Sequence, residues 1–139
     1  MPMSDERVAQ YIRRGAITCS EETSLIFVAQ IMVVNRIRYC VVISKNHEVQ
    51  GLISADSMID AFDKDFGQRK AVDIVSRDPM VTVTSSTPLR EAIDLMAKKG
   101  VEHIIVVSDR PGSRAVIGIV AARDIIAGMA RRQEEEGRS

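Results

Sequence analysis

Short apolar runs and amphipathic stretches alternate along this chain in an order that occurs twice. The runs at 17–19, 39–44 and 49–54 have the length of strands, and the stretches at 24–35 and 55–64 carry apolar side chains at helical spacing. The second set of predicted elements has the same order: strands at 81–83, 103–108 and 115–120, and helices at 88–99 and 121–132. Each half therefore predicts a β-α-β-β-α unit, so the fold class is mixed α/β, or α+β, with one small sheet in each half.

Residues that start or stop helices sharpen these predictions. Thr23 is placed to cap the first long helix, and Pro88 favours the first turn of its counterpart, which Gly100 ends. Near the N-terminus, Ser4 predicts the start of a short helix that Gly15 stops.

The two halves also match residue by residue. At an offset of 64 positions the matched pairs are Thr18 with Thr82, Thr23 with Thr87, Leu25 with Leu89, Met32 with Met96 and Ile37 with Val101. After a three-residue lengthening in the second copy, Gly51 matches Gly118. So long a period indicates two copies of one supersecondary unit, each too small to bury its apolar face alone. We expect one globule with a pseudo-twofold axis, in which repeats 8–64 and 71–132 pack through their sheets. The termini 1–7 and 133–139 are expected to be partly disordered.

Composition narrows the function. The chain has 139 residues, and 19 Lys and Arg balance 19 Asp and Glu, so no basic field is expected to attract nucleic acid or anionic lipid. It contains no run of eighteen apolar residues, and residues 1–16 do not resemble a signal peptide, so we expect a cytoplasmic protein with no membrane partner. Cys19 and Cys40 lie in apolar runs and are expected to be buried free thiols. With His47 and His103 as the only histidines, no metal site is predicted.

The ordered set of motifs resembles the cystathionine β-synthase (CBS) domain family, whose tandem pairs are called Bateman modules. The resemblance covers nearly the whole chain, from about Tyr11 to Met129. Its clearest motifs are Met80-Val81-Thr82-Val83, Thr87-Pro88-Leu89-Arg90-Glu91-Ala92, Gly100-Val101-Glu102-His103-Ile104-Ile105-Val106-Val107 and Gly118-Ile119-Val120-Ala121-Ala122-Arg123-Asp124. Val41 and Ile105 stand where the family often has Pro. The resemblance implies a regulatory module that binds adenosine nucleotides in clefts between its halves and acts as an energy or ligand sensor.

The residues themselves indicate where such a ligand would bind. Segments 51–54 and 118–121 are apolar strands that run directly into helix starts, where free N–H groups and the positive end of the helix dipole suit a phosphate. A carboxylate in the first helical turn can accept both hydroxyls of a ribose, as in dinucleotide-binding folds. The family pattern there is Gly, two apolar residues, Ser or Thr, two variable residues, and Asp.

The two copies differ on that pattern. The second keeps Asp124 but has Ala121 at the Ser or Thr position. The first keeps Ser54 but has Ser57 at the Asp position, with Asp56 one residue early and so turned by about 100° on the helix. The cleft served by Asp124 is therefore the predicted nucleotide site. The alternative for Asp124 is a charge that only complements the helix dipole.

Carrying the family's site onto this chain assigns the remaining roles. Asp124 would hold the ribose, and Arg123 the α-phosphate, with Arg38 and His103 as further cations. Arg123 could instead be a solvated helix residue, and His103 could be structural. The residues expected to face the base are Thr18, Thr23, Ile37, Arg38, Tyr39, Cys40 and Val41. The residues of a second, weaker cleft, expected to be empty or weakly occupied, are Ser54, Ser57, Thr82, Thr87, Val101, Glu102, His103, Ile104 and Ile105.

Three classes of function compete. The favoured one is a nucleotide-binding regulatory module that binds AMP, or alternatively ADP or ATP, and signals to a separate effector protein. S-adenosylmethionine and NADH are further candidate ligands. The second class is a ligand-free scaffold or partner-binding pair. The third, an enzyme, is disfavoured because the chain has no Ser-His-Asp, Cys-His or metal-ligand spacing.

The two long helices differ on their outer face. Helix 88–99 is amphipathic, whereas helix 24–35 is apolar nearly all round. A helix that is apolar on both faces needs a partner on both, and one small fold supplies only one. CBS pairs commonly dimerise through such helices, so we expect a homodimer whose contact residues are Ile26, Phe27, Val33 and Val34.

Overall fold

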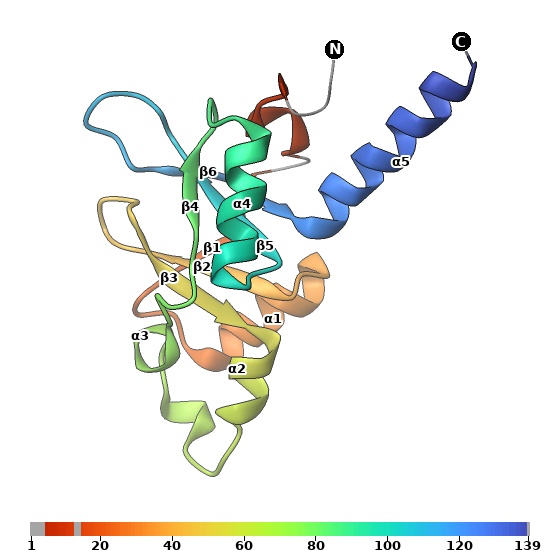
Figure 1. The fold of residues 1–139 in the computed structure, drawn as a ribbon. Coiled ribbons are helices and arrows are strands. Elements are labelled where there is room, and N and C mark those ends of the chain that lie inside the picture. The colour runs from red at the N-terminus through yellow and green to blue at the C-terminus, as the bar shows by residue number, and fades with distance from the viewer. Residues whose placement is uncertain (1–4, 13–14, 139) are drawn as a thin grey trace. The chain divides into compact units, whose positions relative to one another are not determined.

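The computed structural model describes the backbone of residues 5–12 and 15–138 and the side chains as far as Arg131. The chain divides into two compact units (Figure 1), one formed by residues 16–78 and the other by residues 1–15 together with 79–139. Each unit contains one three-stranded sheet and its helices, so the mixed α+β class predicted from the sequence is confirmed.

The unit formed by residues 16–78 has its sheet in the order β1-β2-β3. Its elements are β1 (Thr18–Ser20), α1 (Leu25–Asn35), β2 (Tyr39–Ile43), β3 (Val49–Ser54), α2 (Ala55–Asp60), the 3-10 turn η3 (Phe66–Gln68) and α3 (Ala71–Ile74). Strand β1 runs parallel to β2, and β3 runs antiparallel to it.

The other unit repeats this arrangement, with its sheet in the order β4-β5-β6. Its elements are the 3-10 turn η2 (Val8–Tyr11), β4 (Thr82–Thr84), α4 (Leu89–Lys99), β5 (His103–Val107), β6 (Val116–Ala121) and α5 (Ala122–Arg138). Strand β4 is parallel to β5, and β6 is antiparallel to it.

The registers of the two sheets reproduce the sequence repeat. In one sheet Thr18 pairs with Val41 and Val41 with Leu52, and in the other Thr82 pairs with Ile105. Ile105 pairs in turn with Ile119, the counterpart of Leu52, and both sheets have a register shift at the end of the central strand. Two copies of one supersecondary unit are therefore present, as the sequence predicted.

Alternation along the strands gives each sheet one face covered by helices. In the first sheet Cys40, Val42 and Ile53 pack against residues of α1 and α2. In the second, the equivalent positions Ile104, Val106 and Val120 join the core beneath α4 and α5, whose buried members are Val8, Tyr11, Val81, Val83, Leu89, Ala92, Met96 and Ile125. Thr18 and Val41 alternate with the core residues, so they lie on the opposite face of their sheet.

A segment from the start of the chain completes the second unit. In segment 5–12, the carbonyl of Glu6 accepts a hydrogen bond from the first N–H of α4, that of Leu89, at 2.8 Å. The same segment crosses β6 so closely that a Cβ at Gly118 would lie 2.7 Å from Cγ2 of Ile12. Segment 5–12, which overlaps the start of the first repeat, is thus part of the unit that contains the second.

The linker before the second repeat has the equivalent place in the first unit. In segment 69–76, the carbonyl of Arg69 accepts from the first N–H of α1, that of Leu25, at 3.0 Å. A Cβ at Gly51 would lie 2.5 Å from the backbone oxygen of Ser76. Because Gly51 has no Cβ, the backbone at Ser76 can pass directly against the backbone of β3.

Several predicted boundaries are wrong by small amounts. Strands β1 and β4 begin and end one residue later than expected, and α5 extends to Arg138 instead of ending near 132. The expected N-terminal helix is only the four-residue turn η2, and its predicted start at Ser4 lies outside the described residues. Helix α4 ends at Gly100 in a left-handed conformation, as predicted, while Pro88 is its extended N-cap residue and not its first helical residue.

Thr23 does not cap α1. The cap is Ser24, whose Oγ accepts from the N–H of Phe27 at 3.1 Å. The Thr23 hydroxyl is engaged instead in a tight turn, where it accepts from the N–H of Ser20 at 3.0 Å. Thr87 has the same role in the second unit and accepts from the N–H of Thr84 at 3.1 Å.

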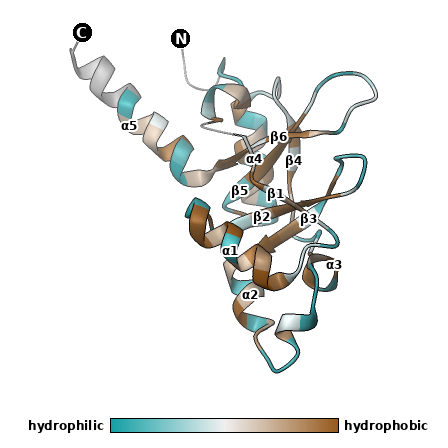
Figure 2. Cartoon of the chain, turned by 180° about the vertical axis from the view of Figure 1, so that it is seen from behind, coloured by the Kyte–Doolittle hydropathy of each residue, from teal (hydrophilic) through white to brown (hydrophobic). Residues whose placement is uncertain are grey.

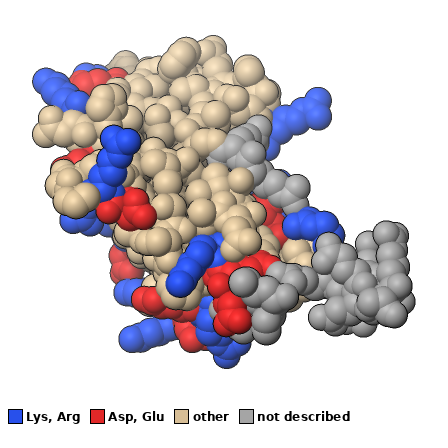
Figure 3. Space-filling model, turned by 90° about the horizontal axis from the view of Figure 1, so that it is seen from above, with Lys and Arg blue, Asp and Glu red and all other residues tan. Residues whose placement is uncertain are grey.

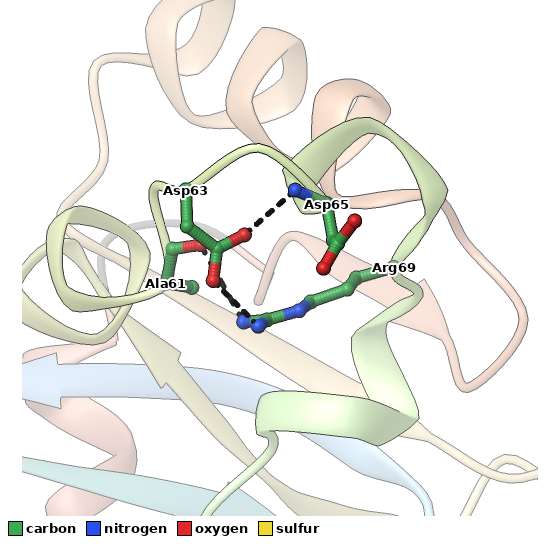
Figure 4. Close-up of polar contacts among 4 residues, drawn as sticks. All are labelled: Ala61, Asp63, Asp65 and Arg69. Atoms are coloured by element: carbon green, nitrogen blue, oxygen red, sulfur yellow. Dashed lines mark hydrogen bonds and ion pairs between the residues drawn. The ribbon is translucent and has the colours of Figure 1, made fainter.

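Helix α2 ends at Asp60, four residues before its predicted end. The following loop is held by Asp63, which accepts from the N–H of Asp65 at 2.9 Å and forms an ion pair with Arg69 at 2.7 Å (Figure 4). Arg69 also donates to the carbonyl of Ala61 at 3.5 Å. These side chains supply hydrogen bonds that continued helix would have made, so the chain turns here.

Candidate functional site

Both sheets deliver their last strand directly into a helix, and the first N–H of each helix is bonded in the same way. The N–H of Ala55 donates to the carbonyl of Arg38 at 2.9 Å, and the N–H of Ala122 donates to the carbonyl of Glu102 at 2.7 Å. This contact holds the start of the central strand beside the start of the helix. Residues far apart in sequence are thereby gathered at one corner of each unit.

In the first unit the helix start is capped by a side chain. Ser54 is the N-cap residue of α2, and its Oγ accepts from the N–H of Ser57 at 3.0 Å. The two hydroxyls lie 2.9 Å apart. Ser57 occupies the position where the family pattern has Asp, so this corner holds two neutral hydroxyls.

In the second unit the cap is reversed. Ala121 has no side-chain oxygen, and the carboxylate of Asp124 reaches back so that its Oδ2 accepts from the N–H of Ala121 at 3.1 Å. These are the two halves of a capping box, one made in each unit. Through this hydrogen bond Asp124 caps the start of the 17-residue helix α5. A carboxylate has about four acceptor positions, so one cap bond leaves capacity for a ligand.

The structure groups the predicted site residues by unit. Thr18, Thr23, Ile37, Arg38, Tyr39, Cys40 and Val41 lie with Ser54 and Ser57 in the first unit. Thr82, Thr87, Val101, Glu102, His103, Ile104 and Ile105 lie with Arg123 and Asp124 in the second. Within the first unit, Tyr39 is the register partner of Ser54, and within the second, His103 is the register partner of Ala121.

The side chains of Cys40 and Ile104 are part of the helix-covered cores and are fully buried. Only their backbone groups are placed to meet a ligand. The hydrogen bond between the Cys19 and Cys40 thiols, followed by burial, raises the pKa of the Cys40 thiol. Cys40 is therefore a protonated core residue at neutral pH, and both cysteines are the buried free thiols that the sequence predicted.

His103 is 8% exposed and belongs to the start of β5. Burial lowers the pKa of its imidazole, and the nearby carboxylate of Glu102 opposes that shift. His103 is therefore neutral at physiological pH, and a neutral ring is a weaker phosphate partner than a cation. Arg123 and Arg38, both exposed, remain the charged candidates.

Two residues that contact predicted site residues were not named as candidates from the sequence. Ser20 and Thr84 share the tight turns of Thr23 and Thr87, with hydroxyl oxygens 3.0 Å and 3.2 Å from those of the threonines. The signal was a small hydroxyl residue three positions before each threonine, at equivalent places in the two copies.

Other classes of site find no support among the residues that the structure describes. No group of three or more His, Cys, Asp or Glu side chains there is arranged to hold a metal ion. Within the same residues, no helix is both long and apolar enough to cross a bilayer. The face shown in Figure 3 carries Lys and Arg as well as Asp and Glu, so charge of one sign does not dominate it.

Comparison with known proteins identifies the class. The model of the CBS domain family matches residues 8–64 and again 71–131, so the chain belongs to the CBS domain family and is a tandem pair of its domains. Pairs of this family are regulatory ligand-binding modules.

Particular relatives are distant. The chain is 29% identical over 129 residues to the uncharacterized protein MK0525 of Methanopyrus kandleri, covering 89% of this chain and 63% of that protein, so it spans less than two thirds of the relative's length. Among solved structures it resembles the CBS domain pair of protein MJ0100 in complex with 5′-methylthioadenosine and S-adenosyl-L-methionine, with TM-score 0.78 and 20% identity over 91% of this chain and 98% of that one. It also resembles a putative acetoin utilization protein (AcuB) from Vibrio cholerae, with TM-score 0.80 and 17% identity over 96% of this chain and 97% of that one.

Proposed function

We propose that this CBS pair binds an adenine nucleotide, AMP in the first place and ADP or ATP as alternatives, and signals its presence to a separate effector protein. Asp124 is assigned to the ribose and Arg123 to the α-phosphate. The first repeat supplies base contacts through Thr18, Thr23 and the segment Ile37–Val41. No resident metal or catalytic residue is part of this proposal.

The observation that supports it is the asymmetry between the two helix starts. The corner of the second unit has a carboxylate in the first turn of α5, whereas the twin corner has the Ser54 and Ser57 hydroxyls. A ribose presents two vicinal hydroxyl donors, and an ionised carboxylate accepts both far more strongly than a serine does. One ligand per chain, with its ribose on Asp124, is therefore the expected stoichiometry.

An adenosine moiety is favoured over other ligands on two grounds. The solved CBS pair of MJ0100 is in complex with two adenosine-containing molecules, which supports this ligand class for the fold. In this chain the first repeat offers apolar side chains and strand-end backbone groups, which suit the flat base and its donor–acceptor edge. S-adenosylmethionine and NADH contain the same moiety and are the alternative ligands.

Calorimetry with AMP, ADP, ATP, S-adenosylmethionine and NADH tests the proposal directly. AMP should bind at about one site per chain, and Asp124→Ala should weaken it by roughly 2–4 kcal/mol, about 30- to 1000-fold, through loss of two charge-assisted hydrogen bonds. The matched control is Ser57→Ala at the twin position, which should leave the affinity unchanged. If none of the five ligands binds saturably, the ligand-free scaffold is the better description of the protein. Full AMP affinity in Asp124→Ala would refute the ribose assignment.

A further inference from the structure

Tyr11, at the end of the turn η2, lies against Gly128 of helix α5. The turn and the helix belong to the same compact unit and pack against each other. A Cβ atom at Gly128 would lie 2.5 Å from Cε1 of Tyr11, closer than two nonbonded carbon atoms approach. Glycine inside a helix is less stable than alanine, and at this position it leaves the space that the ring of Tyr11 occupies.

The ring of Tyr11 is also held by a residue of its own segment. Its Oη donates a hydrogen bond to Oε2 of Glu6, and both side chains are buried. Burial raises the pKa of the Tyr11 phenol, and the positive charge of Arg131, a second residue of α5, opposes that shift. The phenol is therefore a neutral donor at physiological pH, and its ring is a fixed support against which α5 rests.

Gly128 follows Asp124 by one turn of α5. A spacing of four residues places both on the same side of a helix, about 6 Å apart along its axis. Other sides of α5 are open, since Ile126 and Met129 are 60% and 47% exposed, and Figure 2 shows both hydrophobic and hydrophilic residues on the described part of this helix. Tyr11 therefore supports α5 on the side that carries the proposed ribose carboxylate.

The first turn of α5 is anchored independently of Tyr11. Its first N–H donates to the carbonyl of Glu102 at 2.7 Å. With the start fixed, the direction of the helix is set by what it contacts next: the core, which receives the buried side chain of Ile125, and the ring that lies against Gly128. The position of the Asp124 carboxylate, between these contacts and the anchored start, therefore depends on the ring of Tyr11.

The first repeat has other residues at the equivalent positions. The turns η2 and α3 are counterparts, because each has four residues and each begins two residues after the carbonyl that accepts the first N–H of a long helix. The counterpart of Tyr11 is therefore Ile74, and that of Gly128, at the offset of the matched glycines, is Ala61; both contribute to the core of the first unit. Tyrosine is larger than isoleucine and glycine is smaller than alanine, so the two differences compensate in volume.

We propose that Tyr11 is a positioning residue for Asp124, and that segment 5–12 thereby regulates the affinity of the nucleotide site through α5. The ligand itself is that of the proposed function, on which this inference rests. A methyl group at Gly128 would have to move the helix and the ring apart by about 1 Å to reach an ordinary contact of 3.4 Å. Misplacement of a binding group by about 1 Å can cost tenfold or more. Because coupling between sites is reciprocal, a bound nucleotide should in turn hold segment 5–12 more firmly in its unit.

Calorimetry with AMP tests this coupling. Gly128→Ala should weaken AMP binding about tenfold. The double variant Tyr11→Ile/Gly128→Ala, which copies the pair of the first repeat, should bind close to the wild-type affinity. Met129→Ala, at the adjacent exposed position, is the matched control and should bind like the wild type. In the Asp124→Ala background, Gly128→Ala should weaken binding no further, because the group that it displaces is absent. An equal loss in both backgrounds, or wild-type affinity in Gly128→Ala, would overturn the proposal.

The amide proton of Ala121 provides a measurement that needs no ligand. Its charge-assisted hydrogen bond to the Asp124 carboxylate should hold its resonance downfield in the NMR spectrum of the free protein. Gly128→Ala should move this resonance toward its position in Asp124→Ala, and Tyr11→Ile/Gly128→Ala should restore it. An unmoved resonance in Gly128→Ala would refute positioning by Tyr11 whether or not AMP binds. A resonance that moves and is restored, in a protein that binds no AMP, would support the positioning and refute only the nucleotide proposal.

Discussion

Asp124 is expected to stabilise the fold and to bind the ligand, and these two contributions can be separated. Its Oδ2 accepts from the N–H of Ala121 at 3.1 Å, at the start of α5. Loss of a helix cap costs about 1 kcal/mol, and loss of a carboxylate near a helix N-terminus costs about 0.3–1 kcal/mol more. Asp124→Ala should therefore destabilise the ligand-free protein by about 1–2 kcal/mol. With an m-value of about 2 kcal/mol/M, this lowers the urea midpoint by roughly 0.5–1 M.

The first repeat supplies the compensating change. There Ser54 caps α2 by accepting from the N–H of Ser57 at 3.0 Å. Placing the same cap on α5, in the double variant Ala121→Ser/Asp124→Ala, should recover about 1 kcal/mol of the lost stability without restoring the ribose carboxylate.

Urea unfolding followed by circular dichroism, with calorimetry on the same samples, measures both contributions. The double variant should unfold close to the wild-type midpoint and still bind AMP as weakly as Asp124→Ala. If Asp124→Ala unfolds at the wild-type midpoint, the cap bond contributes nothing measurable. If the double variant regains nucleotide affinity, Asp124 acted only through the helix and does not contact the ligand.

Three further outcomes are expected. Arg36 has φ 54° at the end of α1 where its twin Gly100 has φ 68°, so Arg36→Gly should stabilise the protein by about 1 kcal/mol; a lower urea midpoint would contradict this. Ser57→Asp places a carboxylate at the second helix start, and calorimetry should then give about two AMP sites per chain; a wild-type stoichiometry of two would instead show that the hydroxyls suffice. Burial lowers the pKa of His103 below its unfolded value of about 6.5. The unfolded chain therefore binds more protons than the folded chain as the pH falls below that value, so the free energy of unfolding is highest above it and decreases at lower pH. His103→Gln should therefore lose less stability than the wild type between pH 7 and pH 5 in urea titrations, and parallel curves would exclude the effect.

Local signals predicted most of the fold. Short apolar runs located all six strands to within one or two residues, and Gly100 marked the end of α4, because these features depend on neighbouring positions. The end of α2 was missed because it depends on Arg69, a residue from a later segment that reaches back to Asp63 and Ala61. The cap of α1 was missed because two hydroxyl residues stand in succession, and only the turn with Ser20 shows which is already engaged.

The candidate site was predicted less completely, because the surroundings of its residues also depend on other parts of the fold. Residue types and spacing made Asp124 a candidate ligand residue. Ala121 has no polar side chain, and the Asp124 carboxylate caps the helix in its place. The sequence placed Cys40 among base contacts, yet strand register turns its thiol into the core. His103 was considered as a cation, and burial, which a sequence does not display, keeps its imidazole neutral.

Segments 5–12 and 69–76 each complete a compact unit, and this limits where the chain can be cut or rejoined. A fragment with the boundaries of the first repeat, 8–64, would lack the Arg69 carbonyl that receives the first N–H of α1, whereas 16–78 retains it. A circular permutant that joins Ser139 to Met1 through a flexible linker and opens between Asp78 and Pro79 would make each compact unit continuous in sequence.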